Sequence, residues 1–509
     1  MKKIFLSIST IATALSAYSQ EIMPEQNILY GTNQMNGTAR FQSLSGAMGA
    51  LGADASAVSI NPAGSGMFNY NHFSVSGEYM FNKTNNTYYN HNNSSKENSF
   101  YLPNLSAFFT VDKLRDEGVT KVNFGFTYQT MKRFDNYNFT SGNTNQSAVN
   151  YFLNHANTGY NGSAIPLDFV QTMPNETVGD LYDFLNGEAY GFSAQQAMLA
   201  YQGFLINDLA NGYESNMAPG NYYQENISYS SGHQSKLTGN LGLEINKKIY
   251  LGANLNIHFT DHLRNTSFYE ENTDNISTGV KRYEFNNSTY TYGNGFSFQI
   301  GGIAKVTEQL RLGLAYESPT WNKLQDEFSQ SLYSDYYDNN NQLQLANVNP
   351  NLITLFDTYK VVTPGSFTGS LAYVFGKNGL ISFDYQYKDY SKTKYSDNVG
   401  SFAILNDYYK NELKAVNDIR VGAEYRINQV SLRAGYRYAN SPYKNEQMIG
   451  DLNSVSAGIG YSYGTSRLDL GYAFAHQPIK EYPLSSGVPQ AANIKTKTNS
   501  VNLTYTVNF

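Results

Sequence analysis

Residues 249–259 read IYLGANLNIHF, and this stretch decides the fold class. Apolar side chains occupy every odd position from Ile249 to Phe259, while the even positions carry Tyr, Gly, Asn, Asn and His. Because successive side chains of a β-strand point to opposite faces, this alternation separates an apolar face from a polar or small one. The last nine residues, Val501–Phe509, repeat the pattern. The sequence therefore predicts strands whose two faces meet different surroundings.

About fourteen such segments follow residue 72, and the links between them are alternately short and long. Short turns at one end and long loops at the other are typical of outer-membrane barrels. In a soluble β-sandwich, short and long loops do not alternate along the chain. We therefore predict an all-β fold, a closed transmembrane antiparallel β-barrel of about 14 strands. The predicted strands are 72–82, 98–111, 121–131, 235–245, 248–260, 295–305, 309–317, 366–376, 379–389, 417–427, 429–439, 453–463, 466–475 and 498–509.

The first 19 residues have the features of a secretory signal peptide. Lys2 and Lys3 precede an apolar run that ends at Leu15, and small residues follow at Ala17 and Ser19. A membrane anchor helix needs about 20 apolar residues, and this run is shorter and contains Ser and Thr. The 44 Tyr and 30 Phe suit the aromatic girdles of a barrel, and a net charge of -6 over 509 residues gives no reason to expect a nucleic-acid partner.

Residues 38–68 read TARFQSLSGAMGALGADASAVSINPAGSGMF and do not alternate. Their side chains are too small to build a separate core, but their backbone can pack closely inside a larger structure. We therefore expect residues 20–70 to form an N-terminal plug, or hatch, in the lumen of a barrel that spans residues 71–509.

The longest link, residues 132–234, is too long to lack structure of its own. Ser193 and Gln196 have the spacing of a capping box and predict an amphipathic helix. This helix is expected either to pack as a lid on the barrel mouth or to present an apolar patch that captures ligands, and the two roles are compatible. The residues of its predicted apolar face are Ala197, Tyr201, Phe204, Leu205 and Leu209.

The segment SGAMGALGADASAVSINPAG, residues 45–64, resembles the hatch of the FadL family of outer-membrane transporters for long-chain fatty acids and other hydrophobic compounds. RLGLAYESP at 311–319 and LRAGYRYANSPY at 432–443 are also similar to that family, so the resemblance covers nearly the whole chain in order. It assigns the role of hatch and gate to Asn61, Pro62, Ala63 and Gly64.

The resemblance implies a monomeric barrel in the outer membrane of a Gram-negative cell, surrounded by outer-membrane lipid. Phe509 resembles the terminal aromatic residue that the outer-membrane assembly machinery recognises. In the family, ligand passes from an outer groove to an inner pocket and leaves sideways beside a kinked third strand. Gly125 is the candidate for that kink here.

Two neighbouring predicted strands place charged residues in the lumen. If Ile419 and Val421 face lipid, then Arg420 and Glu424 face inward, and the turn near Asn428 sets Glu424 opposite Arg433 and Arg420 opposite Arg437. Arg420 and Arg437 repel each other unless an acid of the hatch or a bound anion lies between them. We hypothesise that Arg420, Arg433 and Arg437 bind the carboxylate of an amphipathic ligand. In the alternative, they are wall charges satisfied by water and hatch groups such as Asp54.

No catalytic residue, metal site or cofactor is predicted, because the seven histidines form no nucleophile or metal motif. The predicted function is passive uptake of hydrophobic compounds, with long-chain fatty acids as the expected ligand. The alternatives are a transporter for another apolar ligand, such as haem or an aromatic hydrocarbon, and a surface adhesin or scaffold. A TonB-dependent receptor is disfavoured because it has a larger plug domain and more strands.

Overall fold

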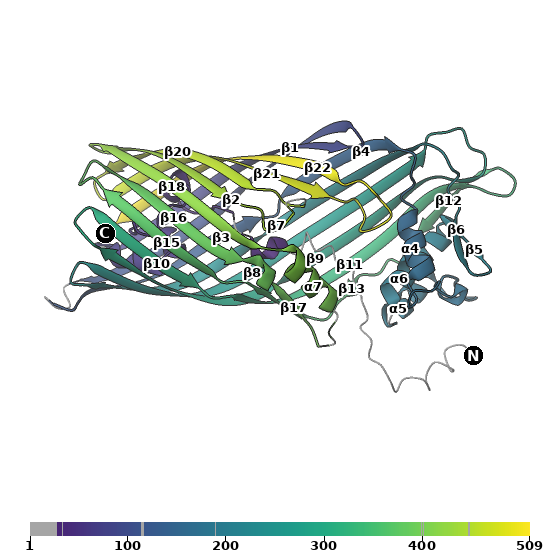
Figure 1. Cartoon of the computed structure of the whole chain (residues 1–509), viewed down its shortest axis with the longest axis horizontal. Coiled ribbons are helices and arrows are strands. Elements are labelled where there is room, and N and C mark those ends of the chain that lie inside the picture. Colours follow the sequence, from purple (N-terminus) through teal and green to yellow (C-terminus); the bar gives the residue numbers. More distant parts are fainter. Residues whose placement is uncertain are drawn as a thin grey trace.

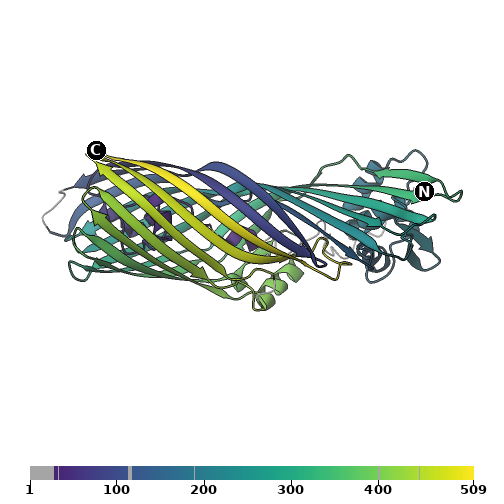
Figure 2. The same cartoon turned by 90° about the horizontal axis from the view of Figure 1, so that it is seen from above.

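The computed structural model of the chain describes residues 28–509, except 33, 113–116, 189, 399, 401, 446 and 447. The predicted signal, residues 1–19, lies outside the described residues. The wall is a closed barrel of 14 antiparallel strands, as the alternation predicts (Figures 1 and 2). Its strands are β1 (His72–Tyr88), β2 (His91–Asp112), β3 (Val119–Arg133), β7 (Tyr222–Ile245), β8 (Ile249–Asn272), β9 (Gly279–Lys305), β10 (Leu310–Glu317), β15 (Ser366–Val374), β16 (Gly379–Asp389), β18 (Ala415–Ile427), β19 (Val430–Ala439), β20 (Leu452–Tyr463), β21 (Ser466–Glu481) and β22 (Ala492–Asn508).

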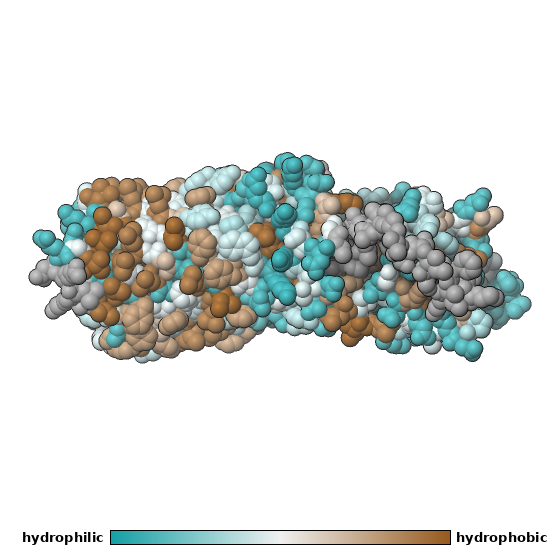
Figure 3. Space-filling model, turned by 90° about the horizontal axis from the view of Figure 1, so that it is seen from below, coloured by the Kyte–Doolittle hydropathy of each residue, from teal (hydrophilic) through white to brown (hydrophobic). Residues whose placement is uncertain are grey.

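The two faces of the wall strands differ as their residues predict. On β8, Ile249, Leu255 and Ile257 are exposed on the outside, whereas Asn254 and Asn256 are buried in the lumen. Apolar side chains cover the outer surface of the half of the molecule that carries the short turns (Figure 3). Burying this surface in lipid is favourable because it removes apolar area from water, so this half is the membrane-spanning part.

The strands β7, β8 and β9 are far longer than a membrane requires. They contain 24, 24 and 27 residues, whereas about 9–11 residues cross a bilayer. Their outer halves, with several shorter strands, project on the long-loop side as an extension of the wall (Figure 1). The shorter strands are β4 (Asn136–Thr144), β11 (Thr320–Tyr337), β12 (Leu343–Val348), β13 (Thr354–Leu355), β14 (Tyr359–Thr363) and β17 (Lys394–Ser396).

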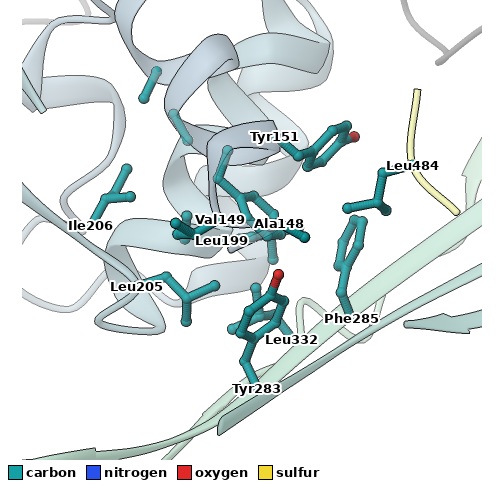
Figure 4. Close-up of a cluster of buried hydrophobic side chains, with 14 of the residues drawn as sticks. Ala148, Val149, Tyr151, Leu199, Leu205, Ile206, Tyr283, Phe285, Leu332 and Leu484 are labelled. Atoms are coloured by element: carbon teal, nitrogen blue, oxygen red, sulfur yellow. The ribbon is translucent and has the colours of Figure 1, made fainter. Parts of the chain in front are cut away.

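A helical lobe, residues 145–221, packs against one face of this extension (Figure 1). Side chains of the lobe, such as Tyr151 and Leu205, meet Phe285 and Leu332 of the sheet in a buried apolar cluster (Figure 4). The lobe contains α4 (Asn150–Thr158), α5 (Val178–Asn186), α6 (Gly191–Gln202) and the hairpin of β5 (Ile206–Leu209) and β6 (Gly212–Ser215). A further helix, α7 (Ala403–Glu412), precedes β18, and no helix of the described residues is long and apolar enough to span a bilayer.

The predicted helix of the lobe exists, but its predicted start was wrong. Helix α6 begins at Gly191, so Ser193 lies inside it, and its hydroxyl hydrogen-bonds His155. The capping box of the lobe is instead Thr177 with Asp180 at the start of α5. The predicted apolar face was also too long, because α6 ends at Gln202 and Leu209 is exposed on β5.

Residues 34–71 fill the lumen of the membrane-spanning half as the predicted plug. They form α3 (Ala39–Ser43) and the 3-10 turns η3 (Ala57–Ser59) and η4 (Pro62–Met67). The wall touches the plug backbone through glycines that face inward. A Cβ added to Gly252 would lie 2.3 Å from the carbonyl carbon of Pro62, and one added to Gly313 would lie 2.5 Å from the Gly49 oxygen. Residues with side chains do not fit here, so the glycines let the plug seat directly on the wall.

The wall has a side seam, which we define as the outer part of β2, residues 91–103, facing β4 across a break in the backbone ladder. Pairing of β2 with β3 ends at Asn104, and among the described residues no strand pairs with β2 on that side farther out. Side chains bridge the seam instead, as where Ser95 donates to the Tyr137 carbonyl at 2.7 Å. The third strand breaks between β3 and β4, at residues 134–135, and not at Gly125, which is regularly paired beneath the Phe108 ring.

Candidate ligand cavity and plug

A cavity of about 550 Å³ lies in the lumen between the plug and the outer loops. Met35 and Phe41 of the plug line it on one side, and Pro442 and Met448 of an outer loop line it on another. Its volume is in the range of pockets that enclose small organic molecules, about 300–1,000 Å³. The lining combines apolar residues with charged ones, including Lys132, Lys388, Arg420 and Arg437. Such a cavity suits a ligand that has an apolar body and a polar end.

Arg420 and Arg437 lie opposite each other on β18 and β19, in the predicted register, and both line the cavity. Asp418 lies between them. Its carboxylate accepts a hydrogen bond from Arg420 at 2.7 Å and one from Arg437 at 2.8 Å, and Arg420 also donates to Gln386. The acid that relieves the repulsion therefore comes from the wall. One carboxylate bridges the two guanidinium groups, and the carboxylates of Asp384 and Glu317 also interact electrostatically with Arg420.

Arg433 lies apart from this cluster, although it pairs with Glu424 as predicted. Its side chain is completely buried, donates to Glu424 at 2.8 Å and lies 2.9 Å from Asp469. Arg40 of the plug donates to the same Glu424 carboxylate at 3.0 Å. Arg433 does not line the cavity, so these contacts indicate that it supports the plug and the wall. The alternative named Asp54 of the plug as a partner of these three arginines. Its carboxylate instead accepts hydrogen bonds from the Thr38 hydroxyl and the Ser56 amide.

The residues Asn61 to Gly64 lie where the plug meets β8, β9 and β10. The Asn61 side chain caps the turn η4 by accepting from the Ala63 amide, and it donates to the carbonyls of Gly49 and Gly302 at 2.8 and 3.1 Å. Pro62 occupies the first turn, where a missing amide proton is harmless. Gly64 packs against Gly52, where a Cβ would lie 3.1 Å from the Gly52 Cα. The four residues thus anchor the plug to the wall.

The residues that lead into the plug cross the lumen as a strap, residues 30–32 and 34–36, and reach the side seam. At one end, the Gly31 carbonyl accepts from Lys388 at 2.8 Å. At the other, the Gln34 amide donates to the Met131 carbonyl at 3.1 Å, and the Gln34 side chain accepts from the Arg133 amide at 2.9 Å. Gln34 thereby hydrogen-bonds backbone groups of β3 at Met131 and Arg133, beyond the point where the pairing of β3 with β2 ends.

Sequence reasoning missed Asp418 and the strap. Asp418 was available from the alternation, because it stands two residues before Arg420 and therefore shares its face. The strap gave no comparable signal, since its contacts with β3 and β16 are made across the lumen by backbone groups and by single side chains such as Gln34 and Lys388.

A 14-strand barrel with its own N-terminal plug and an internal amphipathic cavity defines an outer-membrane transport protein. The model of the outer membrane protein transport protein family (OMPP1/FadL/TodX) matches residues 205–509, and the chain therefore belongs to this family of outer-membrane transporters for hydrophobic compounds. This is a family of transport channels and not of enzymes.

Two solved structures share the fold at low sequence identity. A FadL homologue of Pseudomonas aeruginosa is 14% identical, with 94% of this chain and 100% of that chain covered and a TM-score of 0.52. The toluene transporter TodX of P. putida is 13% identical, with 93% and 99% covered and a TM-score of 0.51. No curated protein matches the chain.

Proposed function

We propose that this protein is a monomeric channel for passive uptake of amphipathic hydrophobic compounds, with long-chain fatty acids as its ligand, and that the plug is its gate. The cavity carries this proposal. Its apolar residues would surround the acyl chain, and Arg420 and Arg437 would bind the carboxylate by charge-assisted hydrogen bonds. Both arginines line the cavity, where an incoming carboxylate can reach them.

The seam supports a sideways exit. Arg133, Phe134 and Asp135 line the cavity at the break between β3 and β4, so the cavity reaches the seam from the inside. Exposed Phe100 and Leu102 lie beside the seam on the outside. We propose that ligand leaves into the lipid at this point when the plug moves and Gln34 releases β3. A hydrophobic ligand would then enter the membrane without passing through water.

The test measures which compounds the protein holds and through which residues. Lipids are extracted from purified protein and identified by mass spectrometry, and binding of a fluorescent fatty acid is compared between the native protein and the double variant Arg420→Gln, Arg437→Gln. We expect recovered fatty acids and binding at least tenfold weaker in the variant, because two charge-assisted bonds contribute about 1.5–3 kcal/mol each. Unchanged binding in a correctly folded variant would refute the carboxylate site.

An uncharged aromatic hydrocarbon is the second candidate ligand. Asp418 already satisfies part of the hydrogen-bonding capacity of both arginines, so the site does not require an anion. The similar TodX structure is named as a toluene transporter. Toluene binding that is unaffected by the double variant, with no fatty acid recovered, would favour this candidate.

A further inference from the structure

The outer surface of the extension carries a groove of about 400 Å³, separate from the lumen. Its floor is the face of β7, β8, β9 and β11 that points away from the helical lobe. Gln330 and Phe285 on the opposite face contact the lobe, so their neighbours Ser329, Ser331 and Asn286 must point outward. We propose that this groove binds a neutral carbohydrate. The proposal concerns a second site and does not depend on the function of the cavity.

The floor consists of two polar rows that cross four strands in register. Strand pairing sets Asn265 opposite Tyr229, Ser288 opposite Asn265, and Ser329 opposite Ser288. The second row pairs Ile227, Ser267, Asn286 and Ser331 in the same way. Neighbouring strands lie about 4.8 Å apart, so the first row offers a polar group on each of its four strands, and the second row on three of them, at intervals comparable to the length of one sugar ring.

The chemistry of the groove favours a neutral polyol. None of the described residues that line it is Asp, Glu, Lys, Arg or His, so the lining residues offer no positive charge to a phosphate or a carboxylate. The neighbouring Glu284 carboxylate accepts hydrogen bonds from Ser267 and Asn286 of the second row. Within the described part of the chain, the side chains of Asn265, Ser288, Ser329 and Ser331 make no hydrogen bond to protein. Amides and hydroxyls both donate and accept, as sugar hydroxyls do. Tyr229, which is 39% exposed, supplies an aromatic ring at one end.

A loop provides the wall of the groove. The strand β12 pairs with β11 as far as Leu332, and β13 resumes the pairing at Phe328, so the intervening residues of β11 pair with β9 on one edge and, among the described residues, with no strand on the other. Residues 349–353 pass this gap, and Asn351 and Leu352 line the groove there. The free edge of β11 adds backbone donors and acceptors to the site, and the exposed side chain of Ile353 can contact the apolar face of a sugar ring.

The experiment uses the full-length protein in detergent and measures binding by calorimetry. The probes are maltoheptaose, a neutral soluble oligosaccharide, a polygalacturonate oligomer as its acidic counterpart, and neutral O-polysaccharide released from Gram-negative cells. The test variant is the double substitution Asn265→Ala, Ser329→Ala, and the matched control is Asn339→Ala at an exposed loop of the same extension. The mobility of every variant in unheated detergent gels is compared with that of the native protein to show that the barrel is folded.

We expect at least one neutral glycan to bind, the acidic oligomer not to bind, and the double variant to bind roughly tenfold more weakly, since each lost hydrogen bond contributes about 0.5–1.5 kcal/mol. The control should bind as the native protein does. Binding of maltoheptaose alone would indicate a glycan from the surroundings, and binding of O-polysaccharide alone would indicate the sugars of the cell surface. If no neutral glycan binds at millimolar concentration, if the acidic oligomer binds better, or if the variant binds equally well, the inference is wrong.

Discussion

Adding one methyl group to the wall at Gly252 should unseat the plug. The Cβ of Gly252→Ala would lie 2.3 Å from the Pro62 carbonyl carbon and 2.4 Å from the Ala63 amide nitrogen, about 1 Å closer than ordinary contact. Both groups are backbone, so no side-chain rotation relieves the clash. Overpacking of this kind destabilises by about 1–3 kcal/mol, and 2–3 kcal/mol would raise the population of displaced plugs roughly 30- to 150-fold.

The assay is ion conductance of the purified protein in planar bilayers, with uptake of a small polar dye into proteoliposomes as a second measurement. Gly302→Ala is the matched control, because its Cβ would lie 3.5 Å from the nearest atom, a Leu251 side-chain carbon. We expect conductance to rise in Gly252→Ala and not in the control. Unheated detergent gels show whether the Gly252→Ala barrel is folded. If a folded Gly252→Ala barrel has the conductance of the native protein, the plug contact is refuted. Gly301→Ala, whose Cβ would clash with Asn61, repeats the test at a second position.

Three further variants probe other contacts. Asn61→Ala removes the cap of η4 and the bond to Gly49, both within the plug, and the bond to Gly302 of the wall, so we expect the seated plug to be destabilised by roughly 2–3 kcal/mol and conductance to rise, and unchanged conductance would contradict this. Gln34→Ala removes the bond to the Arg133 amide at the seam, and fatty-acid uptake into vesicles should become faster if this contact holds the exit shut. Burial raises the pKa of Glu270 to about 7, although Ser147, Ala148 and Gln224 donate to it and oppose the rise. Because the docked lobe favours the protonated form, its docking should weaken by roughly 3 kcal/mol as pH rises from about 4.5 to 7, and hydrogen exchange should show this loss in the native protein but not in Glu270→Gln.

The membrane-spanning half of the fold was predictable because lipid and lumen impose opposite demands on alternate residues. All fourteen predicted strands exist, and 379–389 has the predicted bounds. The prediction made three strands too short at their outer ends. It began β7 at 235 instead of 222, ended β8 at 260 instead of 272, and began β9 at 295 instead of 279. Outside the membrane their outward face is polar, as at Ser267 and Asn286, so the apolar alternation ends although the strands do not.

The candidate site was predictable only where it lies on regular strands. The register of β18 and β19 follows from a two-residue turn, so the pairs Arg420–Arg437 and Glu424–Arg433 could be predicted. The burial of Arg433 could not, because it depends on Arg40 and Asp469, which come from distant parts of the chain. The break in β3 falls at Phe134 and Asp135, which are neither Gly nor Pro, so β3 itself gave no signal for the seam. The available signal was Pro103 of β2, which lacks an amide proton and stands where the pairing of β2 with β3 ends.

The seat of the plug has a consequence for how the molecule is assembled. The plug is synthesised first, yet it bonds to the last strand, where Thr504 accepts from the Ala39 amide at 2.7 Å and Asn502 donates to the Gly37 carbonyl at 2.9 Å. These partners exist only after β22 is in place, so the seat of the plug is complete only when the two ends of the chain have met.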